Sequence, residues 1–272
     1  MSPLRPPAVA GSFYPRQPGE LSMLIDSLLR TARREKLIHP PKALIVPHAG
    51  YRYSGPIAAS AYACLDEAAQ RIARVVLLGP AHHVSVRGLA LPAADGFETP
   101  LGTVPIDRDA VEAVSAFPQV SQNAYAHAPE HSLEVQLPFL QKILGGFKLV
   151  PFVVGFSSVE QLTGVLDALW GGPETLIVAS SDLSHYLTYK GAQQTDRKTA
   201  QDILKLRAKI TPGQACGAAV INGLLSAAAS HGLAARLLDL RNSFDTAGDR
   251  ECVVGYGAFV LCEGAPGEAD VL

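Results

Sequence analysis

Three histidines of this 272-residue chain each follow a short apolar run, within a few residues of the point where the run ends. The pairs are Ala43–Val46 with His48, Arg74–Leu78 with His82, and Thr175–Ala179 with His185. Neutral imidazole is the commonest protein ligand for metal ions, and it titrates near neutral pH. Two histidines and one carboxylate are the usual ligand set of non-haem Fe(II), and zinc hydrolases use related sets. The pattern therefore predicts metal or acid–base chemistry.

These apolar runs alternate with segments of helical periodicity, which is typical of a three-layer α/β/α sandwich. We expect helices at Glu20–Arg34, Pro56–Leu65 and Ser132–Leu144, with a kink at Pro138. Leu89–Ala93 and Gly102–Ile106 could pair as antiparallel strands, which would make the central sheet mixed. No linker-like segment divides the chain, so we expect one domain over residues 1–272. Ligands of such sheets bind beyond the carboxyl ends of the strands, where the three histidines would converge.

Two further clusters carry groups that suit the same chemistry. His131 precedes a predicted helix, and Glu134 lies in its first turn, where an acid also stabilises the helix dipole. The polar segment between the last two predicted strands could complete a metal site through Asp245 or, as weaker choices, Asp249 or Cys252. An ordinary solvated loop is the alternative interpretation of that segment.

Composition excludes several other classes of protein. Apolar residues make up 48% of the chain and charged residues 18%, which indicates a large folded core rather than disorder. The net charge of −2 provides no basic surface for nucleic acid, and no apolar run approaches the roughly 20 residues that span a bilayer. The four cysteines form no CxxC pair, and the first residues do not form a signal peptide, so we expect a cytoplasmic location. The P-loop and GxSxG motifs are also absent.

Five short motifs, in order along the chain, resemble those of the Memo family, whose prokaryotic members are called AmmeMemoRadiSam system protein B. The resemblance extends from Arg5 to Leu261. The motifs are the segments 7–15 (PAVAGSFYP), 47–51 (PHAGY), 79–83 (GPAHH), 130–134 (EHSLE) and 180–185 (SSDLSH).

The resemblance implies the fold of the LigB-type class III extradiol dioxygenases, a mixed-sheet sandwich that holds Fe(II) with two histidines and a glutamate. For eukaryotic members of the family, the resemblance implies iron or copper bound through two histidines and a cysteine. By motif, His48 and His82 match the two ligand histidines, and His185 with Asp182 matches a polar pair of the same pocket. His131 also lies in a shared motif.

The third ligand is where this sequence departs from the family. The family cysteine matches Asp245 when one gap is allowed, and Thr246 without a gap. Asp245 would restore the set of two histidines and a carboxylate that the dioxygenases use.

The resemblance and the histidines together favour a metal-dependent oxidoreductase that acts on a small substrate. Fe(II) is the favoured metal, with Cu or Zn as alternatives, held by His48, His82 and Asp245. His185, Asp182 and His131 would then hold or move protons.

The alternative function is a non-catalytic binding or scaffold protein for a peptide or a phospho-ligand. Tyr51, Arg52, Tyr53 and Arg87 near the expected pocket could hold an anionic or aromatic group. The family name also suggests an AMMECR-type protein and a radical SAM protein as partners. This chain has no CxxxCxxC motif, so it is not itself the radical SAM component.

Overall fold

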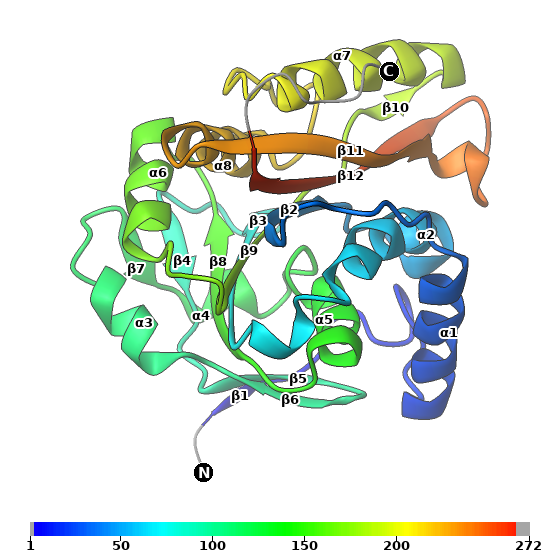
Figure 1. The fold of residues 1–272 in the computed structure, drawn as a ribbon. Helices are drawn as coiled ribbons and strands as arrows, with labels where there is room; N and C mark the ends of the chain where they lie inside the picture. Colours follow the sequence, from blue (N-terminus) through cyan, green and yellow to red (C-terminus); the bar gives the residue numbers. More distant parts are fainter. Residues whose placement is uncertain (1–2, 265–272) are drawn as a thin grey trace.

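A nine-stranded mixed sheet runs through the protein, with helices on both of its faces (Figure 1). The structure is a computed structural model, and it describes residues 3–264. In spatial order the strands are β10 (His185–Leu187), β12 (Val253–Glu263), β2 (Pro41–Val46), β9 (Thr175–Ser180), β3 (Arg74–Pro80), β8 (Lys148–Val154), β4 (Leu89–Leu91) and β7 (Val120–Gln122), and β11 (Leu233–Asn242) also pairs with β12. The predicted three-layer α/β/α architecture is confirmed.

The remaining elements are a small sheet and the helices. The small sheet consists of β1 (Leu4–Arg5), β5 (Gly96–Thr99) and β6 (Gly102–Pro105). The α-helices are α1 (Pro18–Thr31), α2 (Tyr51–Tyr62), α3 (Arg108–Val114), α4 (Ala124–His127), α5 (Leu137–Leu144), α6 (Val159–Ala168), α7 (Tyr189–Leu204) and α8 (Ala218–Ser230). Short 3₁₀ turns are η1 (Ala63–Leu65), η2 (Ala69–Arg71), η3 (Glu134–Gln136) and η4 (Ser243–Asp245). Within residues 3–264, no helix is long and apolar enough to cross a bilayer.

Four neighbouring strands, β2, β9, β3 and β8, run parallel at the centre of the sheet. Val46 at the end of β2 lies opposite Ser180 at the end of β9, and Leu78 of β3 lies opposite Ala179. The carboxyl ends of these strands are therefore level, so residues that follow them meet at one edge. The histidine-bearing strands β2, β9 and β3 are neighbours, which is the condition for their histidines to converge.

Two apolar cores cover the two faces of the sheet. On β2, Leu44 and Val46 pack toward α1, α2 and α5, whereas Ala43 and Ile45 pack toward α6, α7 and α8. All four side chains are fully buried, as period-two alternation in a strand covered on both faces requires. Each buried aliphatic side chain of this kind stabilises the fold by roughly 1.5–3 kcal/mol, so the sheet is a rigid support for the site at its edge.

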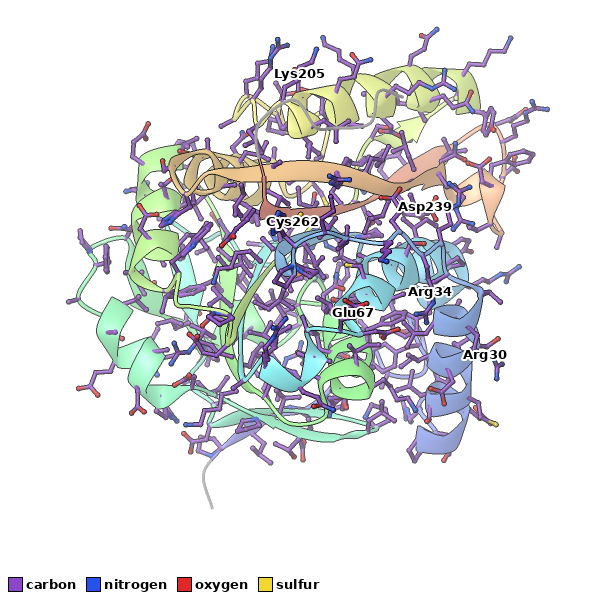
Figure 2. All side chains as sticks on the ribbon, viewed as in Figure 1. Arg30, Arg34, Glu67, Lys205, Asp239 and Cys262 are labelled. Atoms are coloured by element: carbon purple, nitrogen blue, oxygen red, sulfur yellow. The ribbon has the colours of Figure 1, made fainter. Side chains whose placement is uncertain are left out.

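The buried carboxylate of Asp239 links β11 to the helical layer beside it (Figure 2 labels Asp239). The carboxylate of Asp239 on β11 accepts from the guanidinium of Arg241 and from the hydroxyl of Ser60 on α2. Arg33, just after α1, lies 3.4 Å from the same carboxylate. The buried charge is therefore paired and hydrogen-bonded, as its removal from water requires.

Two predicted helices begin at other residues in the structure. The first, expected from Pro56, begins at Tyr51 directly after the histidine loop and includes Pro56, because its buried apolar face outweighs one lost backbone hydrogen bond. The second, expected from Ser132, begins at Leu137 after the turn η3. Pro138 therefore lies in the first helical turn, where its missing N–H costs nothing, and it causes no kink.

The predicted pairing of Leu89–Ala93 with Gly102–Ile106 is wrong. β4 joins the main sheet beside β8 and β7, because its side chains are buried on both faces. β6 instead forms a hairpin with β5. Gly102 makes the tight turn of this hairpin at a φ of +120°, a conformation that only glycine adopts readily.

Gly79, near the end of β3, lets the segment around Ser132 pack directly on the strand. A Cβ at position 79 would lie 2.5 Å from Oγ and 2.9 Å from Cβ of Ser132. We predict that Gly79→Ala lowers the free energy of unfolding by about 1–3 kcal/mol, the usual cost of overpacking. Gly213→Ala is the matched control, because a Cβ added at position 213 would meet no other group within 4 Å. Urea denaturation measures both variants, and equal stabilities would contradict this account of the packing.

Candidate metal centre

The imidazoles of His48, His82 and His131 gather beyond the carboxyl ends of β2 and β3. One ligand nitrogen from each lies within 4.8 Å of the others. The ring centroids are 5.1 Å apart for His48 and His82, 4.7 Å for His82 and His131, and 5.5 Å for His48 and His131. Metal–nitrogen bonds of about 2.0–2.1 Å let one ion join nitrogens up to about 4.2 Å apart. Three ligands therefore converge on one position after slight inward movement.

Hydrogen bonds determine which nitrogen of His48 faces this position. Nδ1 lies 2.9 Å from Oγ of Ser180. That hydroxyl donates its one proton to the carbonyl of Ser132 and accepts from the side-chain amide of Gln136. It can therefore only accept from Nδ1–H, which leaves Nε2 with a free lone pair. The backbone N–H of His48 is held by Oδ1 of Asp182 at 2.7 Å.

The buried carboxylate of Glu130 orients the other two histidines. Oε2 accepts from the backbone N–H of His82, and Oε1 accepts from Nδ1 of the same residue at 2.9 Å. Oε1 also accepts from the backbone N–H groups of His131 and Ser132, and it lies 3.4 Å from Nδ1 of His131. Burial alone would raise the pKa of Glu130, but the hydrogen bonds from His82 and Ser132 hold it well below its usual range. The ionised acceptor leaves Nε2 of His82 free, as in carboxylate–histidine–metal sites.

Burial keeps the imidazoles of His48 and His131 electrically neutral at neutral pH, which is the state that binds metals. Burial lowers the pKa of His48 well below its usual value, and the neighbouring histidines lower it further. Burial likewise lowers the pKa of His131 to about 4. His48 is only 2% exposed, whereas the side chains of His131 and His82 are 17% and 27% exposed. The cluster is therefore closed at His48 and open to solvent at His82.

The N-terminal segment forms one wall of the cluster. The ring of Phe13 packs on His131 with centroids 4.8 Å apart, and the carbonyl of Phe13 accepts from the N–H of Tyr51. Glu134 holds this segment in place, because its carboxylate accepts from Arg5, from the hydroxyl of Tyr14 and from two backbone N–H groups. Glu134 is thus a fully occupied structural anchor.

His185 and Asp182 follow β9 at the same edge of the sheet. Nδ1 of His185 donates to the carbonyl of Leu183 at 2.8 Å, so its Nε2 is the free nitrogen. Burial lowers the pKa of His185. Burial also raises the pKa of Asp182 to about 7, although the hydrogen bond that its carboxylate accepts from the backbone N–H of His48 lowers this pKa. Their catalytic roles stay predictions, and the raised pKa of Asp182 is suited to proton transfer near neutral pH.

The structure brings His131, and not Asp245, to His48 and His82. Asp245 is exposed in η4, where its carboxylate accepts from the backbone N–H of Asn242 and from the hydroxyl of Tyr189. Asp249 and Cys252 of this loop also lie outside the cluster, and the hydroxyl of Thr246 donates to the carbonyl of Ser243. Because the carboxylate of Asp245 closes the capping box of η4, moving it to the histidines would break both of its hydrogen bonds.

Cys216 is the residue near the cluster that sequence reasoning missed. Its Sγ lies 3.2 Å from Nε2 of His48, although 168 positions separate the two residues. Along the sequence, its only local signal is the Cys-Gly pair that directly precedes α8.

Tyr51 was predicted as a group that could bind a ligand in the pocket. In the structure it is buried, and its hydroxyl donates to the carbonyl of Val135.

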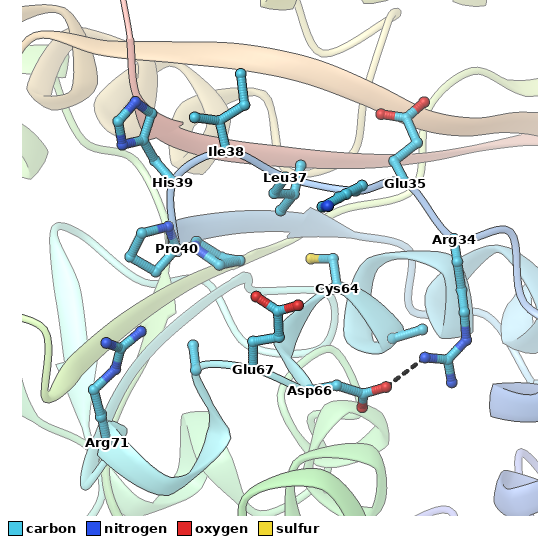
Figure 3. A pocket seen from close by; sticks show the side chains of 14 residues that line it. Arg34, Glu35, Leu37, Ile38, His39, Pro40, Cys64, Asp66, Glu67 and Arg71 are labelled. Atoms are coloured by element: carbon cyan, nitrogen blue, oxygen red, sulfur yellow. Dashed lines mark hydrogen bonds and ion pairs between the residues drawn. The ribbon is translucent and has the colours of Figure 1, made fainter.

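A cavity of about 570 Å³ lies away from the cluster of His48, His82 and His131, at the amino end of β2 (Figure 3). Arg34 and Asp66 on its wall form an ion pair, and Glu35, Glu67 and Arg71 add charge of both signs. The thiol of Cys64 faces it and donates to the carbonyl of Ala61. The positive and negative side chains of this cavity offset each other. The cluster of His48, His82 and His131 is therefore the better candidate for a catalytic site.

Comparison with known proteins identifies the family. The family model described as Memo-like protein matches residues 5–260. The chain belongs to the Memo family. A MEMO1 family protein of Aquifex aeolicus is 37% identical over 93% of this chain and 97% of its own length. MEMO1 family proteins of Methanosarcina acetivorans and Methanopyrus kandleri are 36% and 35% identical, over 95% and 96% of this chain and 99% of their own lengths.

A buried carboxylate on α7, that of Asp196, holds the segment SSDLSH (residues 180–185) in place. Its carboxylate accepts from the backbone N–H of Ser184 at 3.0 Å. Burial raises the pKa of Asp196 from 3.8 to about 6, and that hydrogen bond opposes the shift. Between these values the folded chain holds a proton that the unfolded chain has lost, so the free energy of unfolding falls as pH rises from about 4 to 6.

We predict that Asp196→Asn removes this part of the pH dependence. The difference in unfolding free energy between variant and wild type should change by about 2–3 kcal/mol across that window, since one pKa unit corresponds to about 1.4 kcal/mol. Urea denaturation at a series of pH values measures it, with the exposed Asp109→Asn as control. Parallel wild-type and Asp196→Asn profiles would show that the carboxyl group of Asp196 does not titrate in this way.

Proposed function

We propose that this Memo-family protein is a metal-dependent oxidoreductase that uses Fe(II) and dioxygen on a small substrate. The observation that carries the proposal is the convergence of His48, His82 and His131 at one edge of the sheet. Glu130 and Ser180 bond to Nδ1 of His82 and His48, so Nε2 of each is free for a metal.

The donor set fits such an ion. Imidazole nitrogens suit Fe, Cu and Zn, and three protein ligands leave positions open for substrate and oxygen. A bound ferrous ion would supply the one-electron chemistry that reactions of dioxygen require. The exposed side of the cluster at His82 provides access for a small substrate.

The residues beside the cluster would handle protons. His185 has its Nδ1–H committed to Leu183, so Nε2 is the atom that would take a proton from a substrate hydroxyl. Asp182, with its pKa raised to about 7 by burial, would exchange a proton near neutrality. Its Oδ1 also holds the backbone of His48, so it would position that ligand as well.

The test begins with metal loading. Protein loaded anaerobically with Fe(II) should hold about one ion per chain, and His48→Ala and His82→Ala should each lose most of it, because a ligand is missing. His39→Ala, which changes an exposed histidine at the other end of β2, should bind as wild type does. Elemental analysis after gel filtration gives the stoichiometry. Unchanged iron content in both ligand variants would contradict the proposal, and parallel loading with Cu and Zn tests the choice of metal.

Turnover is then measured with an oxygen electrode on a panel of catechols and other small phenols. The iron-loaded protein should consume oxygen, and His185→Gln should keep its iron but consume oxygen at least 100-fold more slowly, the usual contribution of a positioned base. Iron binding without oxygen consumption across the panel would contradict the oxidoreductase and would favour a non-catalytic binding role.

A further inference from the structure

The exposed face of helix α7 carries only basic and amide side chains. The exposed positions of α7 and of its C-cap residue recur at intervals of three and four residues, so they lie on one face about 22 Å long. Figure 2 shows side chains that end in nitrogen projecting from α7 away from the sheet. This surface, which we call the α7 face, consists of Lys190, Gln194, Arg197, Lys198, Gln201 and Lys205.

The two acidic residues of α7 are buried and do not neutralise this face. The carboxylate of Asp196 accepts from the backbone N–H of Ser184. That of Asp202 lies 3.4 Å from the guanidinium of Arg207 and 3.6 Å from the ammonium group of Lys209, just beyond the helix. Within residues 3–264, none of the four cations of the α7 face forms an ion pair with an acidic side chain. Their positive charge is therefore available to a partner.

The net charge of the whole chain conceals this positive face. The chain carries −2 in total, yet residues 189–210 contain six basic residues and two acidic ones. The rest of the chain is therefore clearly negative. The loop near the N-terminal end of α7 is an example, since it contains Asp245, Asp249 and Glu251. Positive charge is thus concentrated over the middle and the C-terminal end of the helix.

We propose that the α7 face binds the phosphate groups of an anionic lipid bilayer, so that the protein attaches reversibly to a membrane surface. The inference goes beyond the metal centre and does not depend on it. A flat layer of phosphate groups requires only a row of cations along a convex ridge, which α7 provides. Each basic side chain close to such a surface strengthens binding about 5-fold, so four of them together give substantial affinity.

Nucleic acid is the other polyanion that such charge attracts, but α7 suits it poorly. The inner side of the helix is buried, because Ala200 and Ile203 belong to the apolar core that also contains residues of β11 and β12. A helix that reads DNA enters the major groove, which requires more of its circumference to be free. The α7 face also has no aromatic side chain on which a base could stack. These features favour the lipid surface.

Co-sedimentation of the full chain with lipid vesicles tests the proposal. The protein should sediment with vesicles of phosphatidylcholine that contain about 30% phosphatidylglycerol, because these are negatively charged. It should stay in solution with vesicles of phosphatidylcholine alone. Raising the salt concentration from about 0.05 M to about 0.5 M should release the bound protein, since salt screens the attraction between exposed charges.

The double variant Arg197→Gln/Lys198→Gln should bind the anionic vesicles about 25-fold more weakly, because it loses two charges worth about 5-fold each. The matched control is Arg30→Gln/Lys36→Gln, which removes the same charge from exposed positions at the end of α1 and just beyond it, away from α7 (Figure 2). This control should bind as wild type does. Circular dichroism checks that both double variants are folded.

Three results would overturn the proposal. The first is a wild-type protein that stays in solution with anionic vesicles at low salt, and the second is an equal loss of binding in the two double variants. The third is preferential binding of a short DNA duplex in competition with the vesicles, which would indicate a nucleic-acid surface instead. His48→Ala should bind vesicles as wild type does, so failure of the metal proposal and failure of this one are distinguishable.

Discussion

The carboxylate of Glu130 is the group on which the geometry of the histidine cluster depends. It is 2% exposed and negatively charged, a combination that is costly unless every lone pair is used. Here it accepts from three backbone N–H groups and from Nδ1 of His82. Hydrogen bonds to a charged group contribute roughly 1.5–3 kcal/mol each, so the four together outweigh the burial cost. The same bonds turn Nε2 of His82 toward the cluster.

The sheet and the loops bring this carboxylate to the right place. Level strand ends put the loops that carry His48 and His82 at one edge of the sheet, on either side of β9. The absence of a side chain at Gly79 lets the segment with Glu130 and His131 pack against β3. Ser180, at the end of β9, joins the two halves by accepting from His48 and donating to Ser132. Glycine therefore acts at this edge by permitting close approach.

The sequence was sufficient for the parts of this arrangement that depend on local pattern. Apolar runs ending before His48 and His82 predict buried parallel strands, and the strand-end rule then predicts that these histidines meet. The third ligand and Cys216 depend on contacts between distant segments. A carboxylate at Asp245 was plausible from spacing alone, but its lone pairs are used by Asn242 and Tyr189 in the folded chain. The Cys-Gly pair before α8 does not by itself mark Cys216 as a neighbour of His48.

The most direct test of this account compares metal affinity in wild type and Glu130→Gln, measured by competition with a chromophoric chelator. The amide keeps the size of the side chain but removes its charge, so His82 loses its charged acceptor. Loss of such a supporting group typically weakens metal binding 10–100-fold, and we predict a loss in that range. Glu160→Gln, at an exposed position on α6, should bind as wild type does. Equal affinity in Glu130→Gln and wild type, with the variant folded, would contradict the claim that Glu130 builds the metal centre.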